Sequence, residues 1–319
     1  MMKPVIEDKF GRRFRTLRVS LVNHCNLGCV YCVPEEVSSF DGVKNRGMSV
    51  ERLLEMIGRL HGRLGLRAVR LTGGEPLLYR GLAGLVAGIR EMGIEEVKLT
   101  TNGFLLERQA EALFRAGLGS VNVSLDAIDE GVFFRMSRRH SVDRILKGIE
   151  TADLAGLEVK INTVVMKGIN DSQILPLMEW AFERGLRIRL LELMAMGHLK
   201  SGVQALLFSQ AEMLAVIGRR WHYESLGRSD SATSSYWRTE DGHCFGIIAN
   251  ESVPFCGDCD RLRLDSEGNV YGCLSSNQPI ALGLGEDEAV WDVKLRQALE
   301  HKQVLRFVGS ELGMMEIGG

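Results

Sequence analysis

Residues 17–32 read LRVSLVNHCNLGCVYC, a β-rich run that leads into three cysteines, Cys25, Cys29 and Cys32, in the spacing C-x3-C-x2-C. A structural zinc site needs four ligands, usually from two C-x2-C pairs or from a mixture of Cys and His. An iron–sulfur cube has four irons and normally takes four thiolates. Three cysteines leave one iron open for another ligand. The spacing therefore favours an iron–sulfur cluster, with a zinc site or purely structural thiols as alternatives.

The run at 17–22 is the first of six β-rich runs that alternate with amphipathic helical stretches. The other runs are 68–74, 96–103, 120–126, 159–166 and 187–193, and the helical stretches include 49–64, 105–117 and 141–156. Ser49 and Ser141 are expected as N-caps, and Gly117 and Gly156 at helix C-termini. Such alternation requires parallel strands with right-handed crossovers. The sequence predicts an α/β fold, and periodicity leaves an open sheet and a curled, barrel-like sheet as alternatives.

The pattern changes after about residue 200. Residues 201–221 contain at least one predicted helix, 225–237 are rich in Ser and Gly and predict a loop, and 291–303 predict a last helix. We therefore expect a core of residues 1–200 followed by a C-terminal part of residues 201–319.

Composition limits the class of protein. The chain has 319 residues, 45% hydrophobic and 25% charged, with no apolar run long enough for a membrane span and no recognisable signal peptide. We expect a cytoplasmic protein, where seven cysteines point to metal binding or chemistry rather than disulfides. The net charge of −2 argues against a nucleic-acid polymer or a membrane surface as partner. Basic clusters at 11–18, 137–140 and 260–264 fit either a solvated face or a small polyanion.

Chemically distinctive residues follow several of the predicted strands. Cys25 follows the first strand, Gly73, Gly74 and Glu75 the second, and Thr101 and Asn102 the third. Ser124 to Asp126 close the fourth, and Met194 follows the sixth. In parallel α/β folds, ligands bind at the carboxyl ends of the strands. These residues are therefore expected to meet at one mouth.

A second group of cysteines, Cys256, Cys259 and Cys273, has the spacing C-x2-C-x13-C. Taken alone it fits three quarters of a zinc ribbon, completed by Cys244 or His243. Two groups that both lack a fourth cysteine favour a second iron–sulfur cluster instead. Cys244 in the run CFGII is expected to be a small buried residue without a role.

These motifs carry a family resemblance. The first cysteine stretch, with Tyr31 inside it and GGEP at 73–76, resembles the radical S-adenosylmethionine (SAM) superfamily. Within it, LTTNGFLL, SVNVSLDAI, VKINTVVMKGIND, CGDCDRLRLDSEGN and the final IGG resemble the GTP 3′,8-cyclases of molybdenum-cofactor biosynthesis. The resemblance keeps its order from about residue 10 to the last residue.

The resemblance implies a partial (βα)6 TIM-like barrel with a C-terminal extension that carries a second iron–sulfur cluster. Two [4Fe–4S] clusters would face each other across the cavity, the first binding SAM and the second GTP through guanine. A 5′-deoxyadenosyl radical would abstract the 3′ hydrogen of GTP. The product would be (8S)-3′,8-cyclo-7,8-dihydroguanosine 5′-triphosphate, formed in the first step of the pathway.

The resemblance also assigns residues. The metal ligands would be Cys25, Cys29, Cys32, Cys256, Cys259 and Cys273. Those expected to bind SAM are Tyr31, Gly73, Gly74, Glu75, Ser124 and Met194. Those expected to bind GTP are Arg18, Arg70, Thr101, Lys160, Arg261, Leu262 and Arg263. Catalytic roles would fall to Arg261, Arg263, Gly318 and Gly319, with the diglycine tail entering the active site. A frayed terminus and an adenylation signal are the alternatives for that tail.

Partners follow from the same resemblance: an electron donor and a cyclic pyranopterin monophosphate synthase that takes up the product, with a homodimer left open. The loop AMGHLKSG (195–202) and the segment after Cys273 depart from the family pattern, which leaves contacts there undefined. Two rival hypotheses are a radical enzyme acting on a peptide and a non-catalytic protein with two zinc sites. The first usually has more C-terminal cysteines than this chain.

Overall fold

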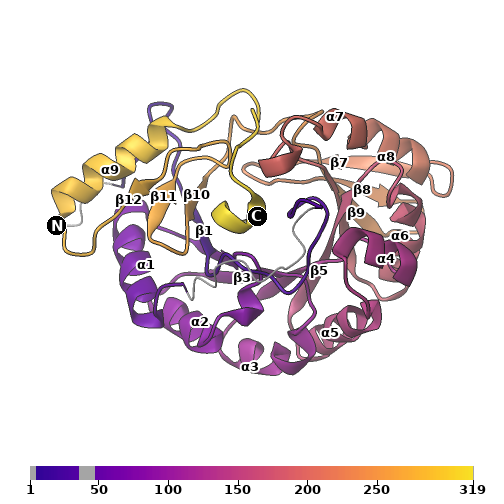
Figure 1. Cartoon of the computed structure of the whole chain (residues 1–319), viewed down its shortest axis with the longest axis horizontal. Coiled ribbons are helices and arrows are strands. Elements are labelled where there is room, and N and C mark those ends of the chain that lie inside the picture. Colours follow the sequence, from indigo (N-terminus) through magenta and orange to yellow (C-terminus); the bar gives the residue numbers. More distant parts are fainter. Residues whose placement is uncertain (1–4, 36–46, 319) are drawn as a thin grey trace.

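The structure is a computed structural model that describes residues 5–35 and 47–318. Within them, one sheet of twelve strands runs in the order β12-β11-β10-β1-β2-β3-β4-β5-β6-β9-β8-β7. Figure 1 shows that the sheet is strongly curved, with most helices on its outer side and the short helix α10 inside the curve.

The strands are β1 Thr16–Ser20, β2 Ala68–Thr72, β3 Glu96–Thr101, β4 Ser120–Ser124, β5 Glu158–Val165, β6 Arg187–Glu192, β7 Tyr223–Gly227, β8 Ser235–Thr239, β9 Cys244–Ile248, β10 Arg261–Leu264, β11 Asn269–Tyr271 and β12 Ile280–Ala281. The α-helices are α1 Val50–Leu64, α2 Leu82–Glu91, α3 Ala110–Arg115, α4 Glu130–Ser137, α5 Val142–Leu154, α6 Ile174–Glu183, α7 Val203–Leu206, α8 Gln210–Ile217, α9 Glu288–Glu300 and α10 Met314–Ile317. Short 3-10 helices cover Pro76–Leu78, Leu106–Arg108, Asp171–Gln173 and Gly197–Leu199.

The six predicted strands are confirmed as β1 to β6, all mutually parallel. The C-terminal part extends this sheet at both edges, because β10 pairs in parallel with β1 and β9 pairs in parallel with β6. The predicted loop at 225–237 is wrong at both ends, since β7 and β8 form an antiparallel hairpin there. Its alternating Ser, Tyr and Trp residues become strand because β8 pairs with the edge of β9.

The helix ends are mostly as predicted. The Ser49 side chain accepts a hydrogen bond from the Arg52 N–H at 3.3 Å, and Gly117 and Gly156 have positive φ after α3 and α5. Ser141 is not the expected side-chain cap: its φ is 80° and its hydroxyl makes no capping bond. Glu130 replaces it, accepting from the backbone N–H groups of Ser141 and Val142 at 2.8 and 2.9 Å.

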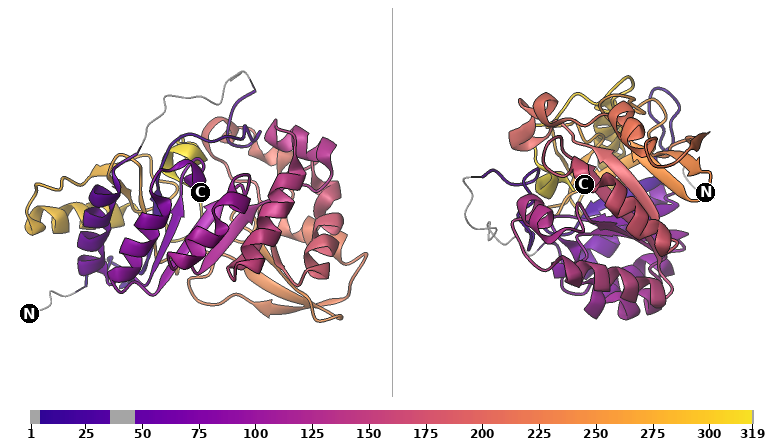
Figure 2. Two further views of the ribbon diagram at one scale, coloured as in Figure 1. Left: turned by 90° about the horizontal axis from the view of Figure 1, so that it is seen from below. Right: turned by 90° about the vertical axis from the view of Figure 1, so that its right-hand side faces the viewer.

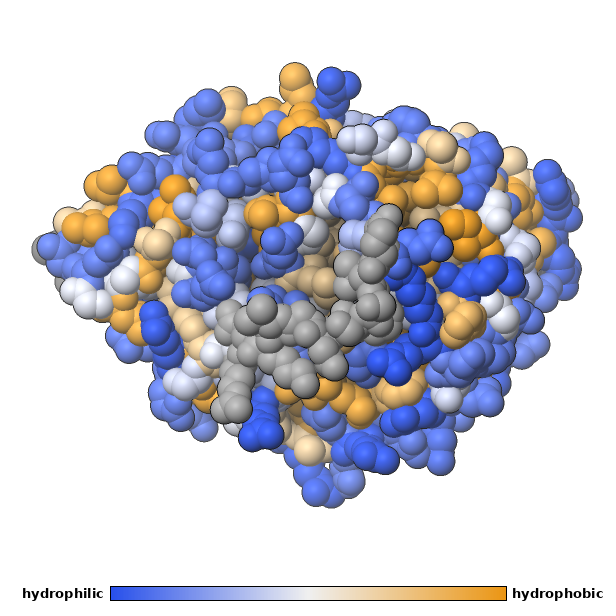
Figure 3. Space-filling view, viewed as in Figure 1, coloured by the Kyte–Doolittle hydropathy of each residue, from blue (hydrophilic) through white to orange (hydrophobic). Residues whose placement is uncertain are grey.

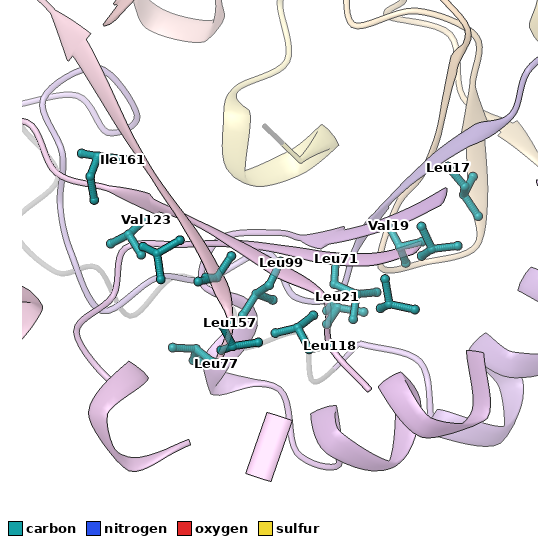
Figure 4. Close-up of a cluster of buried hydrophobic side chains, with 14 of the residues drawn as sticks. Leu17, Val19, Leu21, Leu71, Leu77, Leu99, Leu118, Val123, Leu157 and Ile161 are labelled. Carbon is teal, nitrogen blue, oxygen red and sulfur yellow. The ribbon is translucent and has the colours of Figure 1, made fainter. Parts of the chain in front are cut away.

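The hydrophobic core lies between the sheet and the outer helices. Alternate strand residues, such as Leu17, Val19, Leu71, Leu99 and Val123, point outward and are buried against the helices (Figure 4). The residues between them point to the inner side of the curve and are mainly polar. This alternation leaves a polar interior at the inner face of the sheet. Among the residues described, no helix is both long and apolar enough to span a membrane.

Candidate active site

A cavity of about 320 Å³ occupies the inner side of the curved sheet. It collects residues from the carboxyl ends of the strands and from the C-terminal part. Of the predicted site residues, it is lined by Arg18, Cys25, Cys29, Tyr31, Cys32, Arg70, Gly73, Gly74, Thr101, Ser124, Met194, Cys256, Cys259, Arg261, Arg263 and Cys273. Both cysteine groups therefore face one space, although more than 220 residues separate them in the chain.

The first cysteine group lies on the loop that follows β1. The loop turns tightly, because the Cys29 carbonyl accepts hydrogen bonds from the N–H groups of Cys32 and Val33. The Tyr31 hydroxyl donates to Asp126 Oδ2 at 2.8 Å, which ties the loop to the end of β4. Arg138, at the end of α4, donates to the carbonyls of Val33 and Pro34. Part of the basic cluster at 137–140 thus holds this loop rather than a polyanion.

The chemistry of these thiols fits an iron–sulfur cluster. Burial raises the pKa of Cys25 to about 11, with Glu75 adding to the effect, and burial also raises the pKa values of Cys29 and Cys32. Neighbouring thiols raise the pKa values of Cys29 and Cys32 further, because several anions cannot share a buried site. A cationic metal cluster reverses this penalty, since it binds thiolates and drives deprotonation.

Gly73 and Gly74 follow β2 and allow the loop after β1 to approach closely. A Cβ atom on Gly74 would lie 2.1 Å from the His24 carbonyl oxygen, and one on Gly73 would lie 2.7 Å from that of Val22. Gly73 also has a φ of +143°, which disfavours other residues. The two glycines line the cavity, but the contact that excludes a side chain is with the protein's own backbone.

Glu75 lies outside the cavity lining and is only 1% exposed. Its carboxylate accepts hydrogen bonds from Thr101 Oγ1 at 2.6 Å, from the Asn102 N–H at 2.8 Å and from the Leu77 N–H at 3.0 Å. The Asn102 side chain in turn donates to Asn26 Oδ1 at 2.8 Å and lies 3.5 Å from Cys25 Sγ. The Glu75 side chain therefore organises the ends of β2 and β3 beside the first cysteine.

The second cysteine group is held by two basic side chains. Arg12 Nη1 donates to the carbonyls of Cys256 and Gln303 at 3.0 and 3.1 Å. Lys302 Nζ lies 3.1 Å from Cys259 Sγ. Burial opposes ionisation of Cys259, but Lys302 and Arg261 outweigh it and lower the pKa of that thiol to about 7. Cys256 differs, because burial and Cys273 raise its pKa to about 11.

Within the described residues, no group of three or more His, Cys, Asp and Glu side chains is arranged to hold a single metal ion. Each cysteine of a four-iron cube binds a different iron, so its thiols need not converge on one point. Cys244 and His243, considered for a zinc ribbon, lie at β9, outside the cavity lining.

Cationic side chains form a belt across the inner face of the sheet. Arg263 on β10, Arg18 on β1 and Arg70 on β2 lie side by side in register, and Arg189 on β6 also lines the cavity. Burial, with the neighbouring arginines adding to it, lowers the pKa of Arg18 well below its usual value. Burial likewise lowers the pKa values of Arg70 and Arg263 to about 10. In the part of the chain described, Arg18 Nε and two Arg189 nitrogens are buried without a hydrogen-bond partner. Such a belt fits an anionic ligand.

Besides Glu75, three predicted site residues of the described chain lie outside the cavity lining. The Lys160 amine pairs with Glu158 at 2.8 Å, and Leu262 is fully buried on the outer side of β10. Gly318 packs against Ser20 and Thr72, and its carbonyl accepts a hydrogen bond from Arg263. Gly319 lies outside the described residues.

The structure adds residues to which sequence reasoning assigned no specific role. Asp126 and Arg189 belong to stretches already identified as a strand end and a strand, and their charged side chains among apolar neighbours in the sequence were a usable signal. Lys302 had no local signal, because it follows a long helix and reaches the cavity only through the fold.

Comparisons with known proteins agree with this arrangement. Residues 19–181 match the family described as "Radical SAM superfamily", and residues 186–306 match "Molybdenum Cofactor Synthesis C". A protein of Staphylococcus carnosus (strain TM300) named "GTP 3′,8-cyclase" is 40% identical over 278 residues, which cover 85% of this chain and 82% of that protein. A protein of the same name from Synechocystis sp. (strain ATCC 27184 / PCC 6803 / Kazusa) is 38% identical, covering 88% and 84% of the two chains.

Solved structures share the fold at low identity. SuiB of Streptococcus suis bound to the precursor peptide SuiA gives a TM-score of 0.66 at 18% identity, covering 90% of this chain and 66% of that chain. Native anSMEcpe with bound AdoMet gives a TM-score of 0.63 at 16% identity, covering 86% and 79%. These likenesses show the α/β fold alone. The two family matches and the identity to curated relatives show more: the chain belongs to the GTP 3′,8-cyclase family of radical SAM enzymes.

Proposed function

We propose that this chain cyclises GTP to (8S)-3′,8-cyclo-7,8-dihydroguanosine 5′-triphosphate, the first step of molybdenum-cofactor biosynthesis. The observation that carries the proposal is that two three-cysteine groups and a belt of arginines line one shared cavity. The first cysteine group would hold the source of the radical, and the second would provide a place for the guanine base. The arginines would supply the counter-charge for the phosphates.

In this proposal Cys25, Cys29 and Cys32 hold a [4Fe–4S] cluster whose open iron binds SAM. When bound, this cluster and SAM would together supply the 5′-deoxyadenosyl radical needed to abstract the 3′ hydrogen of GTP. The chain's own residues orient the group. Tyr31 fixes the loop through Asp126, while Ser124 and Met194 line the wall next to it. The backbone at Gly73 and Gly74 forms the adjoining surface.

Cys256, Cys259 and Cys273 would hold the second cluster, with guanine at its open iron. Arg18, Arg70 and Arg263 would bind the triphosphate, because planar guanidinium groups donate paired hydrogen bonds to phosphate oxygens. Arg261 and Thr101 line the same cavity. The low solvent exposure of the arginines supports strong binding of the triphosphate, since buried charge pairs are poorly screened by salt.

The finer architecture belongs to the same proposal. The six βα units would act as a partial (βα)6 barrel, with residues 201–319 closing its open side and the tail reaching the active site. The contact between Gly318 and Arg263 supports that role for the tail, as does the place of α10 inside the curve of the sheet. Closure would keep water away from a radical. A cytoplasmic location, an electron donor, a downstream synthase and a catalytic role for the tail rest on the family resemblance.

The test is an anaerobic incubation of reconstituted protein with reductant, SAM and GTP. We expect 5′-deoxyadenosine together with a cyclised GTP product, and both should depend on GTP. Arg263→Ala should lower GTP turnover at least tenfold while iron content and SAM binding persist. Protein with both clusters intact that yields neither product would contradict the proposal. Deoxyadenosine formation indifferent to GTP would favour the peptide-modifying rival.

A further inference from the structure

Lys302 is a buried lysine next to the second cysteine group. It follows the last turn of α9 and is 7% exposed. Its amine donates to the Arg261 carbonyl at 2.7 Å and lies 3.1 Å from Cys259 Sγ and 5.2 Å from the Phe14 ring centre. The contacts tie a cysteine and the first residue of β10 to one ammonium group at the end of α9.

The surroundings hold this lysine in place. The Lys302 N–H donates to the Leu299 carbonyl, which fixes it to the end of α9. The next residue, Gln303, is fixed by Arg12, whose Nη1 donates hydrogen bonds to the carbonyls of both Gln303 and Cys256. The ammonium therefore points at Cys259 because the backbone on either side is anchored. Its described partners are a thiol and a carbonyl rather than a carboxylate.

A buried lysine without a carboxylate partner is costly unless another anion faces it. A cube held by three thiolates is anionic, and hydrogen bonds and nearby cations at its sulfurs raise its reduction potential. We propose that Lys302 is a positioning residue for the second cluster: it donates a charge-assisted hydrogen bond to the Cys259 thiolate, raises the cluster's reduction potential and anchors Cys259 to β10. This inference rests on the proposed function, which places a cluster at these cysteines.

The test compares redox titrations of the full-length, cluster-loaded protein, followed by electron paramagnetic resonance. The signal of the second cluster is the one that Cys256→Ser removes. Lys302→Met keeps the length of the stem but removes charge and donors, and Lys302→Gln keeps a donor without the charge. We expect Lys302→Met to disfavour reduction of this cluster about tenfold, a shift of about 59 mV to lower potential for one electron. Lys302→Gln should shift it less, and Lys302→Arg least.

Lys294 on α9 offers a matched control, because its amine donates to the Ala281 carbonyl and pairs with Glu286. Lys294→Met should leave the potential unchanged. Selective loss of the second cluster in Lys302→Met, with retention in Lys302→Arg and Lys294→Met, would also support the inference. An unchanged potential in both Lys302→Met and Lys302→Gln would overturn it. Protein with iron only at the first cysteine group would overturn the proposed function together with it.

Discussion

Glu75 shows how one buried carboxylate links strand ends to the first cysteine group. Burial raises its pKa from 4.5 to about 7, although three hydrogen bonds to the carboxylate oppose the shift. Between these two pH values the folded protein binds this proton more tightly than the unfolded chain does. The free energy of unfolding should therefore be highest below pH 4.5 as far as Glu75 contributes. It should fall by on the order of 3 kcal/mol as pH rises through about 7.

Glu75→Gln tests this prediction, because glutamine stays neutral and so removes the contribution of Glu75 to the pH dependence of the free energy of unfolding. Urea unfolding of cluster-free protein at about pH 5 and about pH 8 should show a smaller decrease for the variant than for the parent chain. Asp126, whose pKa burial raises to about 6, contributes a slope of the same sign to both proteins. The difference between the two slopes therefore isolates Glu75, and equal slopes would contradict the prediction.

The same residue marks what a sequence can predict about a site. Each group of three cysteines could be recognised from its spacing as a candidate set of cluster ligands. The motif at 73–76 could be placed at a strand end. Which of its atoms face the cavity could not be predicted. Glu75 turns inward to meet Thr101 and Asn102, because an unpaired carboxylate in that position would be costly. Contacts of this kind depend on neighbouring strands, which local sequence does not specify.

At the scale of single elements, α5 shows a helix start that local sequence did not predict correctly. Ser141 has the residue type of an N-cap, yet Glu130 from the preceding helix α4 accepts from both of the first free N–H groups. A long side chain from another element can replace a local cap, and a pattern confined to neighbouring residues cannot detect that.

Substitutions at these two positions should therefore have unequal effects. Glu130→Ala should lower the free energy of unfolding by about 1 kcal/mol, because two backbone donors lose their acceptor. Ser141→Ala should cost less, and Ser141→Gly should be neutral or stabilising, since Ser141 has a φ of 80°. Urea unfolding of the three variants measures the order. A larger loss for Ser141→Gly than for Glu130→Ala would show that the serine is the true cap.

On the scale of the whole molecule, the six βα units could be predicted because each rests on local periodicity. The edges of the sheet could not. β10 joins β1 from 245 positions away, and β9 joins β6 across the hairpin of β7 and β8. Pairing between strands so far apart in the chain depends on which edges of the curved sheet are still unpaired, and local sequence patterns do not specify this. The hairpin of β7 and β8 projects at one end of the molecule (Figure 2). On the face seen in Figure 1, the surface is largely hydrophilic (Figure 3).

The continuous sheet predicts that residues 1–200 and 201–319 unfold together. Without the C-terminal part, β1 and β6 would become exposed edges of parallel strands, which rarely stand uncovered. In cluster-free protein titrated with urea, hydrogen exchange in peptides from β1, β6, β9 and β10 should report one midpoint. A fragment of residues 1–200 should be insoluble or far less stable than the full chain. An earlier transition confined to β9 and β10, with β1 and β6 still protected, would instead mean that the core forms on its own and that the C-terminal part docks onto it.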